Sequence, residues 1–312
     1  MDVLTDVLTV SAVRGTVGAQ IEAGADWGWW NAATPGAAIH AVTSGSAWLS
    51  VEGELSELVT GDVVLLPRGT AHVIASDPAA AARTGPDAFD DYELRGTGRV
   101  RIGSGPARTH VLCAHYSHDP AVSLPVLDIL PDLTHVRAED RDPSLAGIVA
   151  LLAREMTHPG AAGALVLNRL IDVLLVQLLR AWLASQPALS GPSWLSALSD
   201  PLVGEALAAL HAEPERAWTT AELAREISVS RATLARRFVS AVGTSPAAYL
   251  TRWRMDLAAQ RLRDTAQPLD AVAASVGYTS PYAFSRAFRR AHAQSPGRYR
   301  AATRERLGRV SA

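Results

Sequence analysis

Arginine is the residue type through which the C-terminal third of this chain could do chemistry. Arg236 and Arg286 lie about 50 residues apart, each in a segment that begins with a serine and has phenylalanine at helical spacing. A guanidinium group forms planar, two-point hydrogen bonds with guanine and with phosphate. Two exposed arginines on two short helices therefore predict contact with double-stranded DNA.

Histidine and cysteine form a second candidate set, in the N-terminal half. Cys113 and His115 are two residues apart, which puts both side chains on one face of a strand. With His40 and His72 they could bind zinc or another transition metal such as copper. The alternatives are hydrogen-bonded interior histidines with Cys113 as a small buried hydrophobe, or a Cys113 that senses oxidation. We expect no obligatory cofactor.

The first arginine segment predicts two short helices joined by a tight turn. Thr219 is a suitable N-cap, and Glu222 completes a capping box. Ser230 caps a second helix over residues 231–241. Its inner side carries Leu234, Phe238 and Ala241, and its outer side carries Arg231, Ala232, Ala235 and Arg236. A helix pair of this kind places its second helix in the major groove of DNA.

The same pattern recurs in the second arginine segment. Residues 269–278 predict a first helix and a turn, and Ser280 caps a second helix. A long helix over residues 246–263 would set the two units about 34 Å apart, which is one turn of DNA. The inner residues are Phe284, Ala287 and Phe288, and the outer ones are Tyr282, Ser285, Arg286 and Arg289. The alternative is a plain helical domain with a solvated arginine face, which the tandem repetition disfavours.

The charge of the chain is divided unevenly. Residues 201–312 carry 17 Arg against 9 Asp and Glu, a difference of +8, whereas residues 1–200 carry 12 Arg against 22, a difference of −10. The chain contains no lysine. A basic half joined to an acidic half indicates one part that binds a polyanion and one that does not.

Composition excludes several classes of protein. The 312 residues suit about two domains, and 48% hydrophobic residues can form ordinary cores. A single cysteine, Cys113, excludes an intramolecular disulfide framework and a multi-cysteine zinc site. The sequence has no apolar run of 18 residues and begins with an acidic segment, so we expect a cytoplasmic protein without membrane contact.

The elements that must position these residues change type along the chain. Short apolar runs cut by Gly, Pro and Asp predict the strands of a sandwich or barrel over residues 10–115, with a mobile loop over 76–91. Helical periodicity then predicts helices over 143–156 and 162–185. The second helix is apolar nearly all round, so the first helix or a partner chain must cover it.

Residues 194–300 resemble the DNA-binding domain of the AraC/XylS family of transcription regulators. The matching motifs, in order, are Trp218-Thr219, Leu223-Ala224, Ser230-Arg231, Arg237-Phe238, Gly243-Thr244-Ser245-Pro246, Tyr249-Leu250, Trp253-Arg254-Met255, Val276-Gly277-Tyr278, Phe284-Ser285-Arg286-Ala287-Phe288-Arg289 and Ser295-Pro296-Gly297-Arg298-Tyr299-Arg300. The sequence departs from the family at Pro281, where a polar residue is common, and at Ala293, where glycine is common. Proline is tolerated in a first helical turn, and Ala293 affects only the local turn.

The resemblance implies roles for the outer residues of each second helix. Base contacts fall on Ala232, Ala235, Arg236, Pro281, Tyr282 and Arg286. Alanine can pack on a thymine methyl group, and we expect Arg236 and Arg286 to carry most of the direct readout. Arg231 and Arg289 are expected to bind phosphate. For the helices within 143–185 the resemblance implies a homodimer contact; the alternative is an intramolecular hairpin that packs on the barrel.

The N-terminal half resembles the cupin-type sensory domain that precedes some AraC-like DNA-binding domains. Residues 27–72 carry the resemblance, and Gly61-Asp62, Pro67, Gly69 and His72 follow the spacing of the second cupin motif. Cupin barrels hold small molecules in their mouths. The resemblance therefore implies an effector pocket, lined by His40, Trp48, His72 and Cys113. Trp27, Trp29, Trp30 and Trp48 could line this pocket or belong to the core or an interface.

Catalysis is not expected. A catalytic cupin has a His-x-His pair, a glutamate and a distant histidine, but Val42 stands two residues after His40. A cupin-type metalloenzyme with an appended DNA-binding domain is the alternative function. A DNA-repair methyl acceptor is disfavoured, because Cys113 has no cysteine cluster to bind zinc.

The sequence thus predicts an α+β multidomain protein. Residues 1–140 would form a cupin-like β-barrel sensory domain, and residues 141–190 a helical hairpin for dimerisation and a linker. Residues 191–312 would form an all-α DNA-binding domain, with helix-turn-helix units at about 218–241 and 269–292. The expected function is sequence-specific transcription regulation, with activation favoured over repression and RNA polymerase as partner in activation. A small-molecule effector or a metal in the barrel would control it.

Overall fold

The computed structural model describes residues 3–86, 93–95, 98–117, 127, 130–139, 143–158, 160–185, 197 and 200–310. The chain divides into two compact units. One comprises Arg14–His118 and Leu130–Pro187, and the other comprises Met1–Val13, Asp119–Ile129 and Ala188–Ala312. The helical hairpin therefore belongs with the strands, and the first residues of the chain belong with the C-terminal helices.

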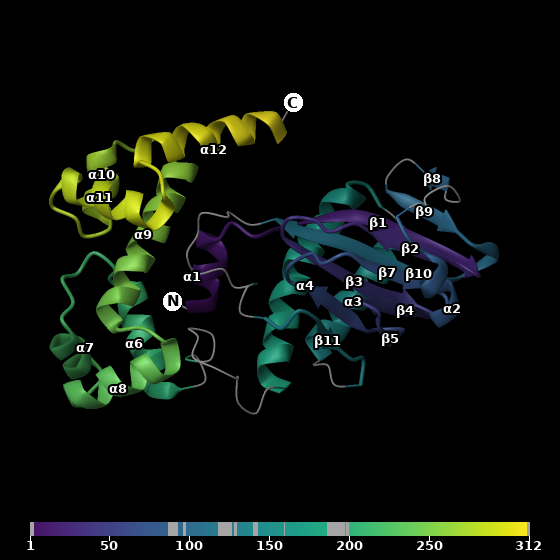
Figure 1. Cartoon of the computed structure of the whole chain (residues 1–312), viewed down its shortest axis with the longest axis horizontal. Helices are drawn as coiled ribbons and strands as arrows, with labels where there is room; N and C mark the ends of the chain where they lie inside the picture. The colour runs from purple at the N-terminus through teal and green to yellow at the C-terminus, as the bar shows by residue number, and fades with distance from the viewer. Residues whose placement is uncertain are drawn as a thin grey trace. The chain divides into compact units, whose positions relative to one another are not determined.

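The strands of the first unit pair into two sheets. They are β1 (Arg14–Ala25), β2 (Gly28–Asn31), β3 (Ala37–Ser44), β4 (Ser46–Val51), β5 (Glu54–Val59), β6 (Val63–Leu66), β7 (His72–Ala75), β8 (Glu93–Arg95), β9 (Arg99–Ile102), β10 (Ser104–Ser117) and β11 (Thr134–Val136). Their order is β11-β6-β3-β10-β1-β9-β8 in the larger sheet and β2-β7-β4-β5 in the smaller (Figure 1). The cupin-like strand-rich half is confirmed, but the described strands form two sheets rather than one closed barrel.

The main core of this unit lies between the two sheets. Ile21 and Val111 from the larger sheet cluster with Leu49 and Ile74 from the smaller, and all four are fully buried. Successive side chains of a strand point to opposite faces, so alternate residues of β1 face either this core or the other side of the sheet. The two faces of β1 therefore line different cavities, with Ala19 in one and Gln20 in the other.

The predicted turn after β6 brings His72 into the interior. Gly69 has a φ of +56°, and a Cβ there would lie 2.2 Å from the carbonyl oxygen of Thr34. Glycine is therefore required at this turn. His72, which opens β7, is only 2% exposed.

A short helix, α2 (Pro78–Arg83), replaces part of the loop predicted over residues 76–91. The Asp77 carboxylate caps it by accepting a hydrogen bond from the amide of Ala80, and the helix begins with Pro78. Ala80 and Ala81 are buried against β7. The prediction was wrong because the alanine run, which has high helix propensity, follows a good N-cap.

The helical hairpin packs on the larger sheet. It consists of α3 (Pro143–Thr157) and α4 (Gly163–Ser185), close to the predicted bounds. Asp172 and Asn168 on α4 accept hydrogen bonds from the backbone amides of Gly15 (2.9 Å) and Val17 (3.2 Å) on β1. The Tyr116 hydroxyl donates to the carbonyl of Ile171 at 2.6 Å. The middle of α4 is therefore fixed to β1.

The second unit is helical, as predicted. Its helices are α1 (Val3–Val10), α6 (Pro201–Ala212), α7 (Thr220–Glu226), α8 (Arg231–Val242), α9 (Pro246–Asp264), α10 (Leu269–Ser275), α11 (Pro281–His292) and α12 (Pro296–Val310) (Figure 1). Ser230 and Ser280, which are 50 residues apart, cap α8 and α11. Gly243 and Ala293, also 50 residues apart, both end these helices in the left-handed conformation. The departure at Ala293 thus leaves the turn geometry unchanged.

Helix α1 packs on α6 and α9, which the sequence does not indicate. Val3, Leu4, Val7 and Val10 are buried. The His211 ring lies between two partners, Asp6 Oδ2 at 3.2 Å from Nδ1 and the Tyr249 hydroxyl at 2.8 Å from Nε2. It also stacks on Trp253, with ring centroids 4.0 Å apart. Burial lowers the pKa of His211 to about 3, so the ring is neutral.

In the part of the chain that the structure describes, none of the helices is long and apolar enough to cross a membrane.

Candidate DNA interface and ligand pocket

The first recognition helix, α8, is placed by the capping pattern that the sequence predicts. The Thr219 hydroxyl accepts from the Glu222 amide (3.1 Å), and the Glu222 carboxylate accepts from the Thr219 amide (2.8 Å). The Ser230 hydroxyl then accepts from the Thr233 amide at 3.1 Å and starts α8. Leu234 and Phe238 are fully buried. Burying this inner side turns the other side of α8 to solvent.

The second recognition helix, α11, repeats this arrangement. The Ser280 hydroxyl accepts from the Ala283 amide at 3.3 Å, and Pro281 occupies the first helical position. Phe284 and Phe288 are fully buried in the core of α9, α10 and α12. Tyr282 is 73% exposed. A tyrosine ring so exposed at the start of a helix is free to contact a partner.

The predicted base and phosphate residues lie on the exposed side of these two helices. Arg231, Ala232, Arg236, Pro281, Tyr282, Arg286 and Arg289 are exposed, and Ala235 is half-buried. In the described part of the chain, Arg231, Arg236, Arg286 and Arg289 form no ion pair or hydrogen bond through their side chains. Four guanidinium groups thus project from the two helices without a partner among the described residues.

Neighbouring arginines have structural partners instead. Arg237 Nη2 donates to Asp200 at 2.8 Å, and Asp200 in turn caps α6. Arg254 donates to the carbonyl of Arg216 at 2.8 Å. The fold therefore separates the arginines that join helices from those whose guanidinium groups are exposed and have no partner in the described part of the chain.

The N-terminal unit contains a pocket of about 570 Å³ at one edge of the two-sheet core. Its lining includes three of the predicted effector residues, His40, His72 and Cys113, together with His115, Trp29 and Trp30. Trp48 does not line it. Trp48 is half-buried on β4 between Ala47 and Leu49, which face the core, so its side chain lies on the opposite face of the sheet.

The two histidines bind each other. His72 Nδ1 donates to the Thr70 carbonyl (2.6 Å), so His72 Nε2 accepts from His40 Nε2 at 2.7 Å. Burial lowers the pKa of His40 well below its usual value, and His72 lowers it further. Burial also lowers the pKa of His72. Both rings are neutral at pH 7.

The residues do not fit a metal ion. Two nitrogens bound to one tetrahedral zinc ion lie about 3.3 Å apart, whereas the two Nε2 atoms are 2.7 Å apart. Within the described ranges, no three His, Cys, Asp or Glu side chains are close enough to share a metal. The candidate metal set of His40, His72, Cys113 and His115 is therefore not assembled.

Cys113 is a buried hydrophobe rather than a reactive thiol. It pairs with His40 across β10 and β3 and is 5% exposed. Burial raises the pKa of its thiol far above the usual value. Because the thiolate is the reactive form, Cys113 is poorly suited to sensing oxidation.

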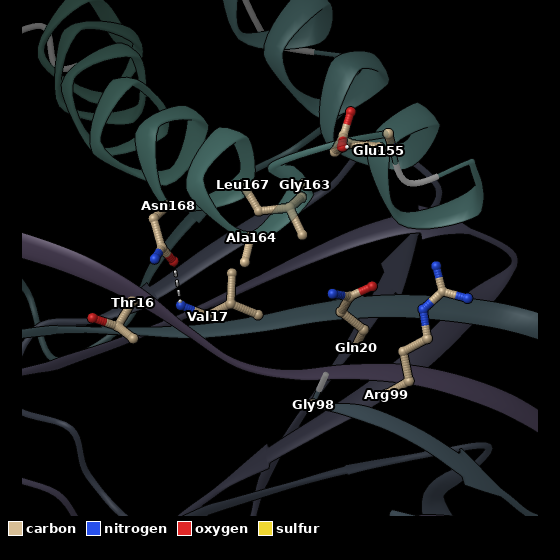
Figure 2. Close-up of a pocket in the computed structure, with 11 residues that line it drawn as sticks. Thr16, Val17, Gln20, Gly98, Arg99, Glu155, Gly163, Ala164, Leu167 and Asn168 are labelled. Atoms are coloured by element: carbon tan, nitrogen blue, oxygen red, sulfur yellow. Dashed lines mark hydrogen bonds between the residues drawn. The ribbon is translucent and has the colours of Figure 1, made fainter. Parts of the chain in front are cut away.

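Sequence reasoning missed one candidate residue, Gln20. Its place in β1 beside Ile21 predicts an outward, solvated side chain, yet Gln20 is only 6% exposed. The hairpin covers this face of the sheet, and only the tertiary structure shows that cover. Figure 2 shows Gln20 among the residues of a cavity between β1 and the hairpin.

Comparison with known proteins finds matches over both units. A family model described as a cupin matches residues 2–184, and one described as a helix-turn-helix domain matches residues 223–302. A putative AraC-like transcription regulator of Streptomyces antibioticus is 38% identical, covering 96% of this chain and 98% of its own. The transcriptional regulator MtrA of Neisseria gonorrhoeae is 31% identical over the same shares.

A further relative and a solved structure also match this chain. The RCS-specific HTH-type transcriptional activator RclR of Escherichia coli is 28% identical over 98% of this chain and 99% of its own. The solved structure of the DNA-binding domain of AdpA with a target DNA is 36% identical. It covers 34% of this chain and 96% of that chain, with a TM-score of 0.32.

Proposed function

Because this chain belongs to the family of AraC-like transcription regulators with an N-terminal cupin domain, we propose that α8 and α11 read adjacent major grooves of one operator. Like its full-length relatives, which are named as transcription regulators, the chain is a DNA-binding regulator and not an enzyme. The observation that carries the proposal is a set of four exposed guanidinium groups on these helices that have no partner in the described ranges: Arg231, Arg236, Arg286 and Arg289.

The roles within each helix follow from position and chemistry. Arg236 and Arg286 lie on the exposed side at the same place in the two repeats, where a guanidinium can pair with a guanine edge. Arg231 and Arg289 bind phosphate and set the register. Ala232, Ala235, Pro281 and Tyr282 supply apolar contacts, such as those with thymine methyl groups.

A small molecule controls this activity from the pocket between the two sheets. The pocket has aromatic walls at Trp29 and Trp30 and a neutral histidine pair at its inner end. Replacing His72 with Phe should remove the response of a reporter gene to an effector bound here and leave DNA binding intact. A response that survives would place the effector elsewhere.

The active form is a homodimer joined through the hairpin. Leu165, Val166 and Val173 on α4 and Leu151 on α3 are large apolar residues that are 37–57% exposed. Val166 and Val173 are seven residues apart and share one stripe of the helix. We expect Val173→Asp to halve the mass measured in solution; a dimer that persists would exclude this stripe.

Activation is the favoured outcome, through contact of the DNA-bound dimer with RNA polymerase in the cytoplasm. The relative RclR is named as an activator. A reporter whose expression rises with added protein supports this assignment, and one whose expression falls contradicts it.

Selection of bound fragments from a random DNA pool tests the reading of DNA. The full chain should enrich one motif with two half-sites about 34 Å apart, one helical turn. Recovery of fragments without a shared motif would contradict sequence-specific reading.

A further inference from the structure

A second cavity lies on the other face of β1, beneath the turn of the hairpin. Its volume is about 720 Å³, which is within the range of small-molecule sites, roughly 300–1,000 Å³. Figure 2 shows Gln20 and Arg99 projecting from the sheet toward the hairpin, where Ala164 and Leu167 of α4 line the cavity. Ala19 faces the pocket between the sheets, whereas its neighbour Gln20 faces this cavity. The two sites are therefore separate.

Gln20 is a largely buried residue whose side chain lines the cavity. It is 94% buried, and its carboxamide forms no hydrogen bond with the described residues. Polar groups in protein interiors pair with protein atoms or with water, so the partner of this carboxamide must lie in the cavity, as water or as a ligand group. A ligand group in the cavity can accept a hydrogen bond from the Gln20 amide nitrogen and donate one to its carbonyl oxygen.

The charged side chains named around the cavity are one guanidinium and two carboxylates. Arg99 is the neighbour of Gln20 in the parallel pair of β1 and β9. Its guanidinium lies 3.7 Å from the Glu22 carboxylate and also donates to the Met156 carbonyl at the end of α3. Glu155 adds a second carboxylate to the lining. An anionic ligand would therefore gain little here.

Apart from Thr16 and Asn168, the remaining walls are apolar or lack side chains. Val17 lies on the sheet side, Ala164 and Leu167 lie on the helix side, and glycines line the gaps between them. This lining fits a flat or compact apolar body. A single polar group on that body would meet Gln20.

We infer that this cavity binds a neutral, mostly apolar molecule with a carboxamide group, which pairs with the carboxamide of Gln20. The first turns of α4 carry Ala164 and Leu167 on the cavity side and Leu165 and Val166 on the exposed side. A ligand beneath them is thus placed to shift the exposed stripe. The effect on the exposed stripe rests on the proposed dimer contact, whereas the binding of the ligand to the cavity does not.

Fluorescence titration of the full chain with 2-naphthamide tests the inference. Saturable binding is expected, and it should weaken by about tenfold or more in Gln20→Leu, which removes the hydrogen bonds. Ala164→Trp should abolish binding by filling the cavity. The matched control is Gln177→Leu, a second glutamine-to-leucine change further along α4, which should bind as the wild type does. Naphthalene and 2-naphthoate should each bind more weakly than the amide.

Several results would overturn the inference. These are the absence of saturable binding, unchanged affinity in both Gln20→Leu and Ala164→Trp, or equal affinity for naphthalene and the amide. DNA binding by the same variants separates this inference from the proposed function. A chain that reads its operator but does not bind 2-naphthamide refutes only the cavity. A chain that binds the amide but reads no operator refutes only the function.

Discussion

At the scale of single residues, two adjacent arginines show how the fold divides its cations. Arg237 is tied to Asp200 by hydrogen bonds from Nε (3.1 Å) and Nη2 (2.8 Å). Arg236 is exposed and has no partner in the described part of the chain. Arg237 therefore contributes to helix packing, and Arg236 remains available to DNA.

Removal of a base-reading arginine should cost specificity. We expect Arg286→Ala to weaken binding to the selected operator by about 1–3 kcal/mol and binding to scrambled DNA by much less. Arg237→Ala is the control, because it should lower stability rather than specificity. Titration of both DNAs with each variant measures the effect. Equal losses on the two DNAs for Arg286→Ala would assign Arg286 to phosphate.

Ala293 is strained where its repeat partner is not. Its φ is +56°, whereas the equivalent Gly243 has a φ of +80°, which glycine adopts without strain. Ala293→Gly should therefore raise the free energy of unfolding by about 1 kcal/mol. The reciprocal variant Gly243→Ala should lower it. Urea denaturation of the full chain provides the measurement, and a destabilised Ala293→Gly would contradict the argument.

The neutral state of His211 predicts acid sensitivity. Its pKa falls from 6.5 in the unfolded chain to about 3 in the folded one, because the ring is buried. Between these values the unfolded state binds the proton and the folded state does not. The contribution of His211 is thus complete above pH 6.5 and is lost below it, by about 1.4 kcal/mol per pH unit. In His211→Gln the free energy of unfolding should vary less between pH 7.5 and 5.5. An unchanged pH dependence would contradict this account.

At the scale of elements, α1 is part of the DNA-binding unit although it begins the chain. Val7 is fully buried against this unit, and Arg263 donates to the Val10 carbonyl at 3.3 Å. Val7→Ala should therefore lower the stability of the helical unit by about 2 kcal/mol. The control is Thr9→Ala on the exposed side of α1. Thermal unfolding should show a lower midpoint for Val7→Ala alone; equal midpoints would mean that α1 contributes no packing.

Local signals explain which elements could be predicted. Thr219, Ser230 and Ser280 each cap a helix through bonds to residues three positions later. Such signals lie within a few residues of sequence, so the sequence predicts α7, α8 and α11 with nearly the bounds that the structure has. The outward arginines followed from helical periodicity.

Long-range packing explains what could not be predicted. Gln20 is buried only because α4, about 150 residues later, covers β1. The contact of Asp6 with His211 joins residues 205 positions apart. Trp48 was assigned to the pocket by residue type, but its strand register turns it away. No local pattern carries these placements.

At the scale of the whole molecule, the acidic and basic halves correspond to different tasks. The basic excess of +8 over residues 201–312 favours phosphate contact, and the acidic excess over residues 1–200 repels DNA from the N-terminal part. Affinity for DNA should therefore fall steeply with salt, because each neutralised phosphate contributes about 0.9 to the slope. Operator specificity must come instead from the two recognition helices.

Binding to an operator whose half-sites are moved apart tests the central claim most directly. Helix α9 joins the two readers within one unit, so they can follow only one spacing. We predict that five base pairs inserted between the half-sites reduce affinity to that for non-specific DNA, a loss of about 100-fold or more. Affinity that is unchanged by the insertion would contradict the account, because one reader would then suffice.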